Sequence, residues 1–331
     1  MQEKRILHAG EHKTTIKGRK EKEMFKCKVY NAEEVKKHNI ILSGNDCFIG
    51  TDEKRRNTEV VHIDFPFTTC NYALFYKGSN EILKNASNAI VTLLNNNTLS
   101  EKQKNNCYKI IVESLHIVHH TNTKDRKSKL NGINSLSTSC LDNRFCLERI
   151  KNNDSICSHC YSATQQKQQL ALQDRNTING IILRNILIPA KYWKKYVNPA
   201  DISKYFRIES FGDVQNTLQA ENYIELCKAF PRVHFAAWTK NVGIYHFAFM
   251  KSEKPVNLSF IVSSNKVNYC ELYHKDTFGN IDHIFTVYDK KYIADNNINI
   301  NCGGKACMEC IRKHKACYFT DTELIVNEQL K

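Results

Sequence analysis

The sequence predicts an α/β fold whose sheet is mostly parallel, and two patterns carry that prediction. After residue 130, apolar runs of strand length alternate with longer stretches of helical spacing. Strands and helices that alternate in this way form βαβ units, which build parallel sheets. In addition, eight of the 14 cysteines fall in two tight groups, so we expect the fold to carry metal chemistry.

The expected elements follow one another along the chain. Alternating or continuous apolar runs predict strands over 60–65, 133–139, 206–210, 233–238, 257–263 and 283–288. Apolar residues at helical spacing predict helices over 81–95, 101–119, 162–185 and 217–229. Because each predicted helix after residue 130 lies between two predicted strands, the sheet should be built from crossover connections.

The 331 residues are expected to divide into three parts. Residues 1–28 are rich in lysine and predict a basic, flexible arm. Residues 29–125 predict a smaller α+β region, for which the sequence indicates no role. Residues 126–331 contain both cysteine groups and predict the metal-binding domain. The boundary is placed in the polar, basic stretch 121–129.

Composition bounds the class of protein and its partners. Hydrophobic residues make up 41% of the chain, which is enough for a packed core. The net charge of +14 favours a polyanionic partner such as nucleic acid or a nucleotide, although an AT-rich genome also enriches lysine. No apolar run reaches the length of a membrane span, and the N-terminus has no apolar signal segment. We therefore expect a cytoplasmic protein whose cysteines are metal ligands, with no membrane partner.

The first cysteine group has the spacing Cys-x5-Cys-x10-Cys-x2-Cys and comprises Cys140, Cys146, Cys157 and Cys160. Thiolates are soft ligands that select zinc or iron–sulfur centres, whereas isolated buried thiols are the alternative interpretation. Four thiolates would close a zinc site, whereas three on a four-iron (4Fe–4S) cluster would leave one iron open. Because the group follows a predicted strand, at the edge where catalytic centres lie, the iron–sulfur cluster is favoured over zinc.

The second cysteine group has the spacing Cys-x4-Cys-x2-Cys-x6-Cys and comprises Cys302, Cys307, Cys310 and Cys317. Four thiolates predict a closed centre that is structural or transfers electrons. A zinc site that contacts nucleic acid is the alternative. The spacing also allows the two groups to share ligands in one centre.

Further candidates stand where predicted strands end, which is the ligand-binding edge of a parallel sheet. They are Gly212, Asp213, Lys240, Ser263 and Asn265. Asp213 and Lys240 are the candidate catalytic residues, because a carboxylate and an ammonium group can contact a cofactor or substrate. A solvated turn is the alternative for both.

Four other polar positions are weighed against simple surface roles. Arg207 and Glu209 alternate with apolar neighbours on one strand, so both are expected to point into a polar centre. His116 and His119, with the adjacent His120, are expected on the exposed face of a helix rather than as ligands. His159 lies between two candidate ligands, where a histidine can support a metal site.

Several motifs, in this order, resemble the phage "gene product 88" family. They are Leu136-Ser137-Thr138-Ser139-Cys140, Cys157-Ser158-His159-Cys160-Tyr161, the stretch from Phe206 to Asp213, Trp238-Thr239-Lys240-Asn241, and the closing Cys-Gly-Gly…Cys-x-x-Cys…Cys-Tyr. The resemblance covers roughly residues 130–320. It implies a phage or mobile-element protein, and hence a location in the host cytoplasm.

The same motifs are distantly similar to radical S-adenosylmethionine enzymes. That similarity implies a partial (βα) barrel with a four-iron cluster in the loop after its first strand. Cys146, Cys157 and Cys160 would be the ligands, with Cys140 as an alternative first ligand. The spacing differs from the Cys-x3-Cys-x2-Cys of that superfamily. Gly212–Asp213 would meet the methionine part of S-adenosylmethionine.

Two functional hypotheses follow. In the first, the chain is an iron–sulfur enzyme that acts by radical or redox chemistry on an unidentified substrate. S-adenosylmethionine is its candidate cofactor. In the second, it is a zinc protein without enzymatic activity that binds nucleic acid or a host protein, in host takeover or counter-defence. Iron content separates the two, because zinc sites contain neither iron nor sulfide.

Overall fold

The computed structural model describes residues 28–30, 41–43, 58–63, 72–76, 81–96, 98–122, 128–272, 279–303, 306–315 and 317–330. Side chains are described from residue 82 onward, apart from Leu170. Residues 1–27 lie outside the described part of the chain, so the basic arm stays a prediction.

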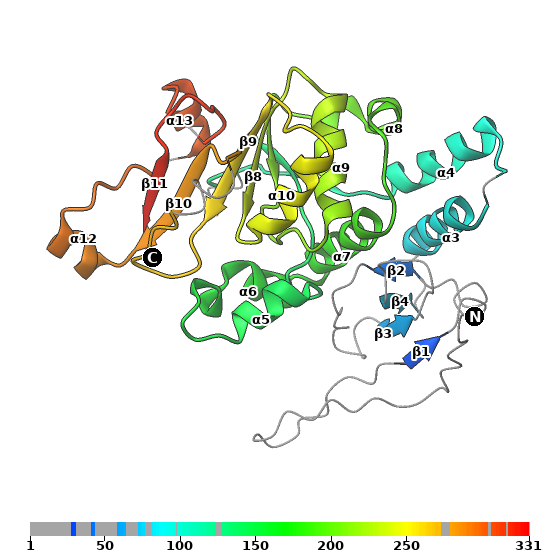
Figure 1. The fold of residues 1–331 in the computed structure, drawn as a ribbon, viewed down its shortest axis with the longest axis horizontal. Helices are drawn as coiled ribbons and strands as arrows, with labels where there is room; N and C mark the ends of the chain where they lie inside the picture. The colour runs from blue at the N-terminus through cyan, green and yellow to red at the C-terminus, as the bar shows by residue number, and fades with distance from the viewer. Residues whose placement is uncertain are drawn as a thin grey trace, which may run out of the picture.

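Seven strands of the described residues form one sheet, in the order β11-β10-β9-β8-β7-β6-β5 (Figure 1). The strands are β5 Ile117–His119, β6 Asn134–Leu136, β7 Tyr205–Ile208, β8 His234–Thr239, β9 Leu258–Ser263, β10 His283–Tyr288 and β11 Ile325–Gln329. Neighbouring strands run parallel, except that β5 and β6 are antiparallel. The predicted α/β fold with a mostly parallel sheet is confirmed.

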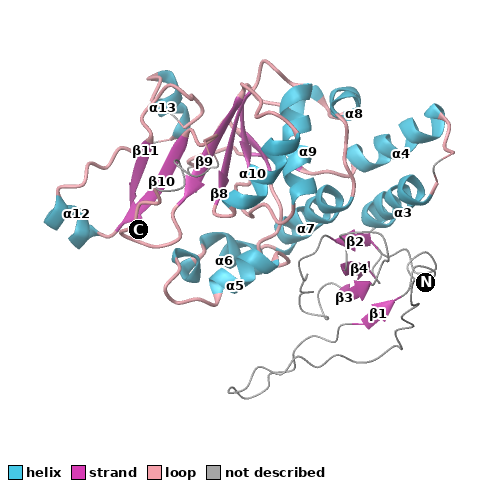
Figure 2. Ribbon diagram, in the orientation of Figure 1, coloured by secondary structure: helices cyan, strands magenta, loops and turns pink. Residues whose placement is uncertain are grey.

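From β6 to β11, each strand lies beside the strand that precedes it in the sequence. Right-handed crossovers between neighbours place their connecting helices on the same face of a sheet. Figure 2 shows α7, α9 and α10 together on one side of the strands. The helices that belong to this layer are α7 Leu170–Asn185, α8 Ala190–Tyr196, α9 Thr217–Ala229 and α10 Val242–Lys251.

The main apolar core lies between the sheet and this helical layer. Phe206, Phe235 and Leu258 are aligned in register on adjacent strands, and all three are buried. Trp193 of α8 and Ile181 of α7 belong to the same core. Burying one such side chain contributes about 1.5–3 kcal/mol, so this layer holds the strand ends in fixed positions.

The opposite face of the sheet carries a second, smaller core. There Ala236 and Ile261 pack with Ile311 of α13 (Cys307–Arg312) and with Tyr318. The second cysteine group therefore lies on the face that the main helical layer leaves uncovered. The remaining C-terminal helix, α12 (Lys290–Asn296), follows β10.

The long connection from β6 to α7 carries the first cysteine group. It contains α5 (Arg144–Ile150), a short 3-10 helix (Ile156–His159) and α6 (Tyr161–Gln168). The predicted helix 162–185 is thus divided, because Gln169, with φ −119° and ψ 87°, leaves the helical conformation between α6 and α7. A second 3-10 helix, Pro199–Asp201, precedes β7.

The predicted helix 81–95 is present as α3 (Glu81–Asn95), but the helix predicted over 101–119 was too long. α4 (Glu101–Glu113) ends at the cap residue Ser114. The β-branched residues Ile117 and Val118 then begin β5, which pairs with β6. This pairing makes 117–119 a strand although the sequence has helical spacing there. His119 therefore lies on a strand, and its Nε2 atom is 2.7 Å from Asp201 Oδ1.

A four-stranded sheet precedes these elements, in the order β1-β3-β4-β2. Its strands are β1 Lys28–Tyr30, β2 Ile41–Ser43, β3 Thr58–Ile63 and β4 Tyr72–Tyr76. Leu83 of α3 and Ile111 of α4 belong to the same core as α7 and α8. Residues on both sides of the boundary predicted near 126 therefore share one core. Among the described helices, none combines the length and hydropathy of a membrane span.

Candidate functional site

The carboxyl ends of β6 to β9 bring the predicted site residues together. The Asn143 side chain, in the segment that follows β6, donates to the Asp213 carbonyl at 2.7 Å. The Lys240 backbone N–H, after β8, donates to Asp213 Oδ2 at 2.8 Å. The Ile156 N–H donates to the Asn265 carbonyl, after β9, at 2.9 Å. The first cysteine segment therefore contacts the ends of β7 and β9.

Within the first group, Cys140 lies deepest, with 1% of its surface exposed. Its Sγ atom accepts a hydrogen bond from Gln166 Nε2 at 3.3 Å. A second hydrogen bond joins it to the thiol of Cys160. Cys146, Cys157 and Cys160 are each partly exposed. The group thus has one inner cysteine and three that reach the surface.

Cys160 is held as a thiolate near neutral pH. It receives the hydrogen bond from Cys140, and it caps α6, so the N–H groups of Ala163 and Ser162 also face it. Together with the positive charge of Lys240, these contacts lower its pKa to about 6 despite its burial. The pKa of Cys140 is raised correspondingly, by that shared hydrogen bond and by burial.

Cys146 lies within electrostatic range of Cys157 and Cys160. Burial raises its pKa well above the usual value, and the negative charges of Asp213 and Glu209 add to the effect. The four thiols of the first group therefore lie within electrostatic range of one another and of the acidic residues Asp142, Glu209 and Asp213.

Asp213 is a buried carboxylate with both oxygens engaged. Oδ1 accepts from Thr239 Oγ1 at 2.5 Å and from the Val214 N–H at 2.8 Å, while Oδ2 accepts from the Lys240 N–H. Burial raises its pKa, and these hydrogen bonds oppose the rise. Asp213 consequently ties the end of β7 to the end of β8. Its predicted catalytic contact stays a prediction.

Glu209 is the residue that sequence reasoning placed wrongly. Its φ of 55° is left-handed, which breaks the alternation of the strand, so its carboxylate does not share the face of Arg207. Instead it accepts from the Thr138 N–H at 2.9 Å, from Gln219 Nε2 at 2.7 Å and from the Tyr223 hydroxyl on α9. Burial raises the pKa of Glu209, and these donors oppose the rise.

Gly212 is required at its position by close packing. A Cβ atom there would lie 2.5 Å from Thr138 Oγ1, 2.6 Å from the Thr138 carbonyl and 2.8 Å from Glu209 Oε2. Only glycine fits against Thr138, in the segment that follows β6, at this point. The turn after β7 can therefore approach the cysteine segment closely.

The two remaining candidates at this edge differ. Ser263 is buried at the end of β9 and pairs in register with Phe285. Asn265 donates its backbone N–H to Glu271 Oε1 at 2.8 Å. Its side-chain Oδ1 is buried and has no hydrogen-bond partner among the described residues. His159 is exposed to solvent.

The second cysteine group is built around two cations. Lys129 Nζ lies 3.5 Å from Cys302 Sγ and 2.7 Å from Glu328 Oε1, and the Lys129 carbonyl accepts from the Cys307 N–H at 2.9 Å. Cys302, in turn, bridges to Glu328 on β11. The neighbouring thiolates and Glu328 raise the pKa of Lys129, although burial opposes them. Lys129 therefore stays charged.

Arg207 supplies the second cation from β7. Its guanidinium carbon lies 3.0 Å from the ring centroid of Trp238. Among the described residues, no carboxylate forms an ion pair with it, and its charge instead acts on Cys307 and Cys317. Burial raises the pKa of Cys317 to about 12, and Arg207 opposes that rise. Lys129 and Arg207 were not predicted as part of this site.

Residues 91–323 match the sequence model of the family described as gene product 88, which is more than half of the chain. The chain belongs to the phage gene product 88 family. No curated protein and no solved structure matches it. The matched range of this gene product 88 protein begins within α3 and includes both cysteine groups, so the family pattern comprises the site and the strands β5 to β10.

The described donor atoms of this gene product 88 protein do not converge on a single metal ion. Within the described ranges, no three His, Cys, Asp or Glu side chains are arranged to hold one metal ion. A four-iron cluster binds each thiolate at a different iron atom, so its ligands need not converge on one point. The three partly exposed thiols Cys146, Cys157 and Cys160 have the donor chemistry that such a cluster takes.

Proposed function

We propose that this gene product 88 protein is an iron–sulfur redox enzyme of the host cytoplasm, similar to radical S-adenosylmethionine enzymes. The observation that carries the proposal is the gathering of four thiols at the carboxyl edge of a parallel sheet. Cys140, Cys146, Cys157 and Cys160 lie there together, beside the ends of β7, β8 and β9. Ligands bind at this edge in parallel α/β folds.

The strand order supports a partial (βα) barrel. Six parallel strands, β6 to β11, follow one another across the sheet in sequence order, as barrel strands do. A doubly wound sheet reverses its strand order at a switch point instead. The first cysteine segment follows the first of these six strands, which is where the proposed cluster belongs.

Cys146, Cys157 and Cys160 are proposed as the cluster ligands. They are the partly exposed members of the group, and Cys160 is held as a thiolate, the form that binds metal. Buried Cys140 would support Cys160 by its hydrogen bond. A cluster with one iron free of protein ligands supplies electrons and a position for a cofactor.

The chain's own residues would bind and orient the cofactor. S-adenosylmethionine is proposed beside Gly212–Asp213 and Asn265, whose unpartnered Oδ1 is available to accept a hydrogen bond. Lys240 would contact its carboxylate, because an ammonium group suits an anion. Asp213 would hold Lys240 in place through the backbone bond between them. Ser263 would close the floor of the site.

For the second group, we propose a closed four-thiolate centre. It would be zinc where metal binding draws the four thiols onto one ion, or an auxiliary cluster, whose thiolates need not converge on one point. Four thiolates around Zn²⁺ carry two net negative charges. Lys129 and Arg207 supply positive charge within range of these thiolates, and Glu328, which pairs with Lys129 at 2.7 Å, offsets part of it. The remaining positive charge supports an anionic centre there. Such a closed site would be structural or would transfer electrons.

The test is cleavage of S-adenosylmethionine by anaerobically reconstituted protein in the presence of a reductant. We expect turnover in the wild type, none in Cys146→Ala and partial turnover in Cys140→Ala, because only the first would remove a ligand. Iron loading without cleavage would overturn the S-adenosylmethionine part and leave a redox protein. Equal loss in both variants would overturn the ligand assignment.

A further inference from the structure

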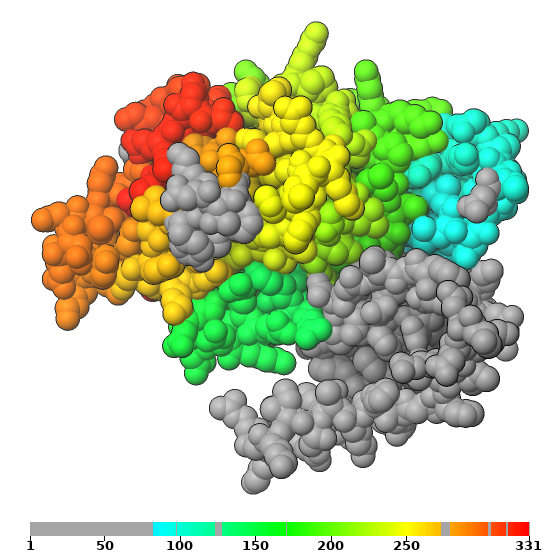
Figure 3. Space-filling view, in the orientation of Figure 1, coloured from blue at the N-terminus to red at the C-terminus, as the bar shows by residue number. Residues whose placement is uncertain are grey.

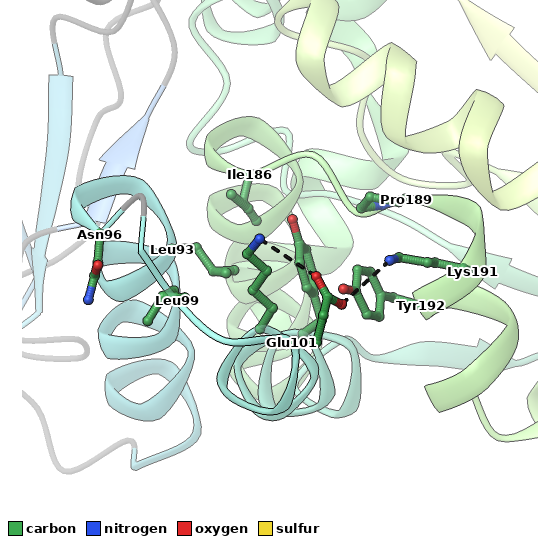
Figure 4. Close-up of a pocket in the computed structure, with 10 residues that line it drawn as sticks. Leu93, Asn96, Leu99, Glu101, Ile186, Pro189, Lys191 and Tyr192 are labelled. Atoms are coloured by element: carbon green, nitrogen blue, oxygen red, sulfur yellow. Dashed lines mark ion pairs between the residues drawn. The ribbon is translucent and has the colours of Figure 1, made fainter.

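A pocket of about 290 Å³ lies between α3, α4 and α8, away from both cysteine groups (Figure 4). Its floor is apolar and its rim is charged. The lining residues of the floor are Leu93, Leu99, Tyr108, Ile186, Pro189 and Tyr192. Glu101, Lys104 and Lys191 stand at the rim, and both lysines form ion pairs with Glu101. Figure 4 shows Lys191 directed at Glu101.

Aromatic rings continue from this pocket along α8. Tyr108 of α4 stacks on Tyr192 with 4.0 Å between ring centroids and 15° between planes. Tyr192 in turn lies nearly parallel to Tyr196, with centroids 6.3 Å apart. The Tyr196 hydroxyl reaches Asn105 Oδ1 at 3.0 Å. A ladder of three tyrosines therefore underlies the contact between α4 and α8.

Lysines cover this ladder, and two of them pair with the carboxylate of Glu101. Glu101 lies 3.7 Å from Lys104 Nζ and 4.0 Å from Lys191 Nζ, and Lys195 Nζ donates to Asn105 at 2.7 Å. Glu101 and Lys191 are largely exposed, so these long ion pairs stabilise little. We name the three lysines and three tyrosines the α4–α8 seam. It carries a net positive charge beside an apolar pocket.

We propose that the α4–α8 seam binds single-stranded nucleic acid, with one base in the pocket and the adjacent phosphates on Lys104, Lys191 and Lys195. Proteins that bind single strands combine aromatic surfaces for bases with cations for the backbone. The exposed lysines can exchange Glu101 for phosphate at low cost, because their present ion pairs are weak. The apolar floor would take up the face of a base.

The seam is separate from the proposed metal chemistry. In the space-filling view, α3 and α4 lie at the end opposite the C-terminal residues that carry the second cysteine group (Figure 3). No cysteine lines the pocket. Binding at the seam can therefore be measured whether or not the protein holds a metal, and its outcome is independent of the function proposed above.

The test is fluorescence anisotropy of the full-length protein with a labelled oligothymidine, across a series of salt concentrations. We expect binding that weakens with salt, with a slope of about −2 for three phosphate contacts. Lys191→Glu combined with Lys195→Glu should weaken binding about tenfold or more. Glu101→Gln, which removes the competing carboxylate, should strengthen it about two- to threefold.

The control is Lys290→Glu combined with Lys291→Glu, the same charge change at exposed positions of α12. Equal loss in the seam and control variants would mean that general positive charge, not the seam, binds the strand, and would overturn the proposal. Absence of binding by the wild type overturns it as well. Binding of thymidine monophosphate as tight as that of the strand would assign the pocket to a free nucleotide and also overturn strand binding.

Discussion

Each cysteine group contains four thiols, but the two groups lie in different electrostatic surroundings. Around the first group the nearby acidic residues are Asp142, Glu209 and Asp213. The cations there are Lys240 and Arg184, and Arg184 forms a buried ion pair with Asp142. Around the second, Lys129 and Arg207 act on Cys302, Cys307 and Cys317. Acidic surroundings disfavour an excess of thiolates, whereas cations favour it.

This difference underlies the proposal of two kinds of centre. In the first group, the pKa of Cys140 is raised, that of Cys160 is lowered to about 6, and three of the thiols lie near the surface. Such a centre suits exchange of ligands or electrons. In the second group the cations are built into the sheet and the link before it, which suits a centre that is always charged and closed.

The largest expected effect is on iron at the first group. Cys157→Ala should abolish iron loading there, because it removes one of three proposed ligands, while metal at the second group is retained. Metal and sulfide analysis of each reconstituted variant makes the comparison.

Cys270→Ala is the matched control, since Cys270 is also partly buried but belongs to neither group. If Cys157→Ala keeps the wild-type iron content and spectrum, the first group is not the iron site and the comparison fails.

The second prediction uses the thiolate of Cys160. In metal-free protein its alkylation by iodoacetamide should rise with a midpoint near pH 6, since its pKa is lowered to about 6 and the thiolate is the nucleophile. Above that pH the rate should level off, and below it the rate should fall tenfold per unit. Peptide mass spectrometry follows this one residue.

Cys140→Ala should move that midpoint upward, because it removes the hydrogen bond that contributes most to the shift. An unchanged midpoint in this variant would show that the helix N-terminus and Lys240 suffice, and that Cys140 and Cys160 are not a pair.

Gly212→Ala should destabilise the fold by about 1–3 kcal/mol, the usual cost of overpacking. Its Cβ would meet Thr138 and Glu209 at 2.5–2.8 Å, so the turn after β7 must move away from the cysteine segment. Urea denaturation measures the change in free energy of unfolding.

Gly243→Ala on α10 is the matched substitution, because nothing lies within 4 Å of its Cβ. It should be neutral, or stabilise by up to about 1 kcal/mol. Equal destabilisation by both variants would contradict the close approach described at Gly212.

The smallest expected effect concerns the second group. Lys129→Gln should lower metal retention there about tenfold, because residues that support metal ligands typically contribute that much. A chelator challenge in the Cys157→Ala background isolates this site. Lys251→Gln is the control, since Lys251 also forms a 2.7 Å ion pair but with Glu221, away from the cysteines. Equal retention in both variants would remove the cation argument.

Local patterns predicted much of the fold, and tertiary contacts decided the rest. Helix 217–229 and strand 283–288 were predicted with the bounds that α9 and β10 have, because their periodicity and length are unambiguous. β5 was missed because residues 117–119 form a strand only by pairing with β6, and the local sequence gives no signal of that pairing. The positive φ of Glu209 leaves no signal in a strand-like sequence.

The candidate site follows the same division. Spacing identified the cysteines and the turn residues at the strand ends, since parallel strands bring their carboxyl ends together. Lys129 was out of reach because it lies 173 residues from Cys302 in the sequence. Strand alternation predicted that Arg207 points away from its apolar neighbours. Its contacts with Trp238 and Tyr318 were not predicted, because those residues come from other parts of the chain.

The most direct measurement is iron and acid-labile sulfide content, with an absorbance spectrum, of the full-length protein purified without oxygen. The account predicts about four iron and four sulfide per chain at the first group, with a broad visible band. Zinc alone, in a colourless protein that anaerobic reconstitution cannot load with iron, would contradict it and leave a zinc protein without this chemistry.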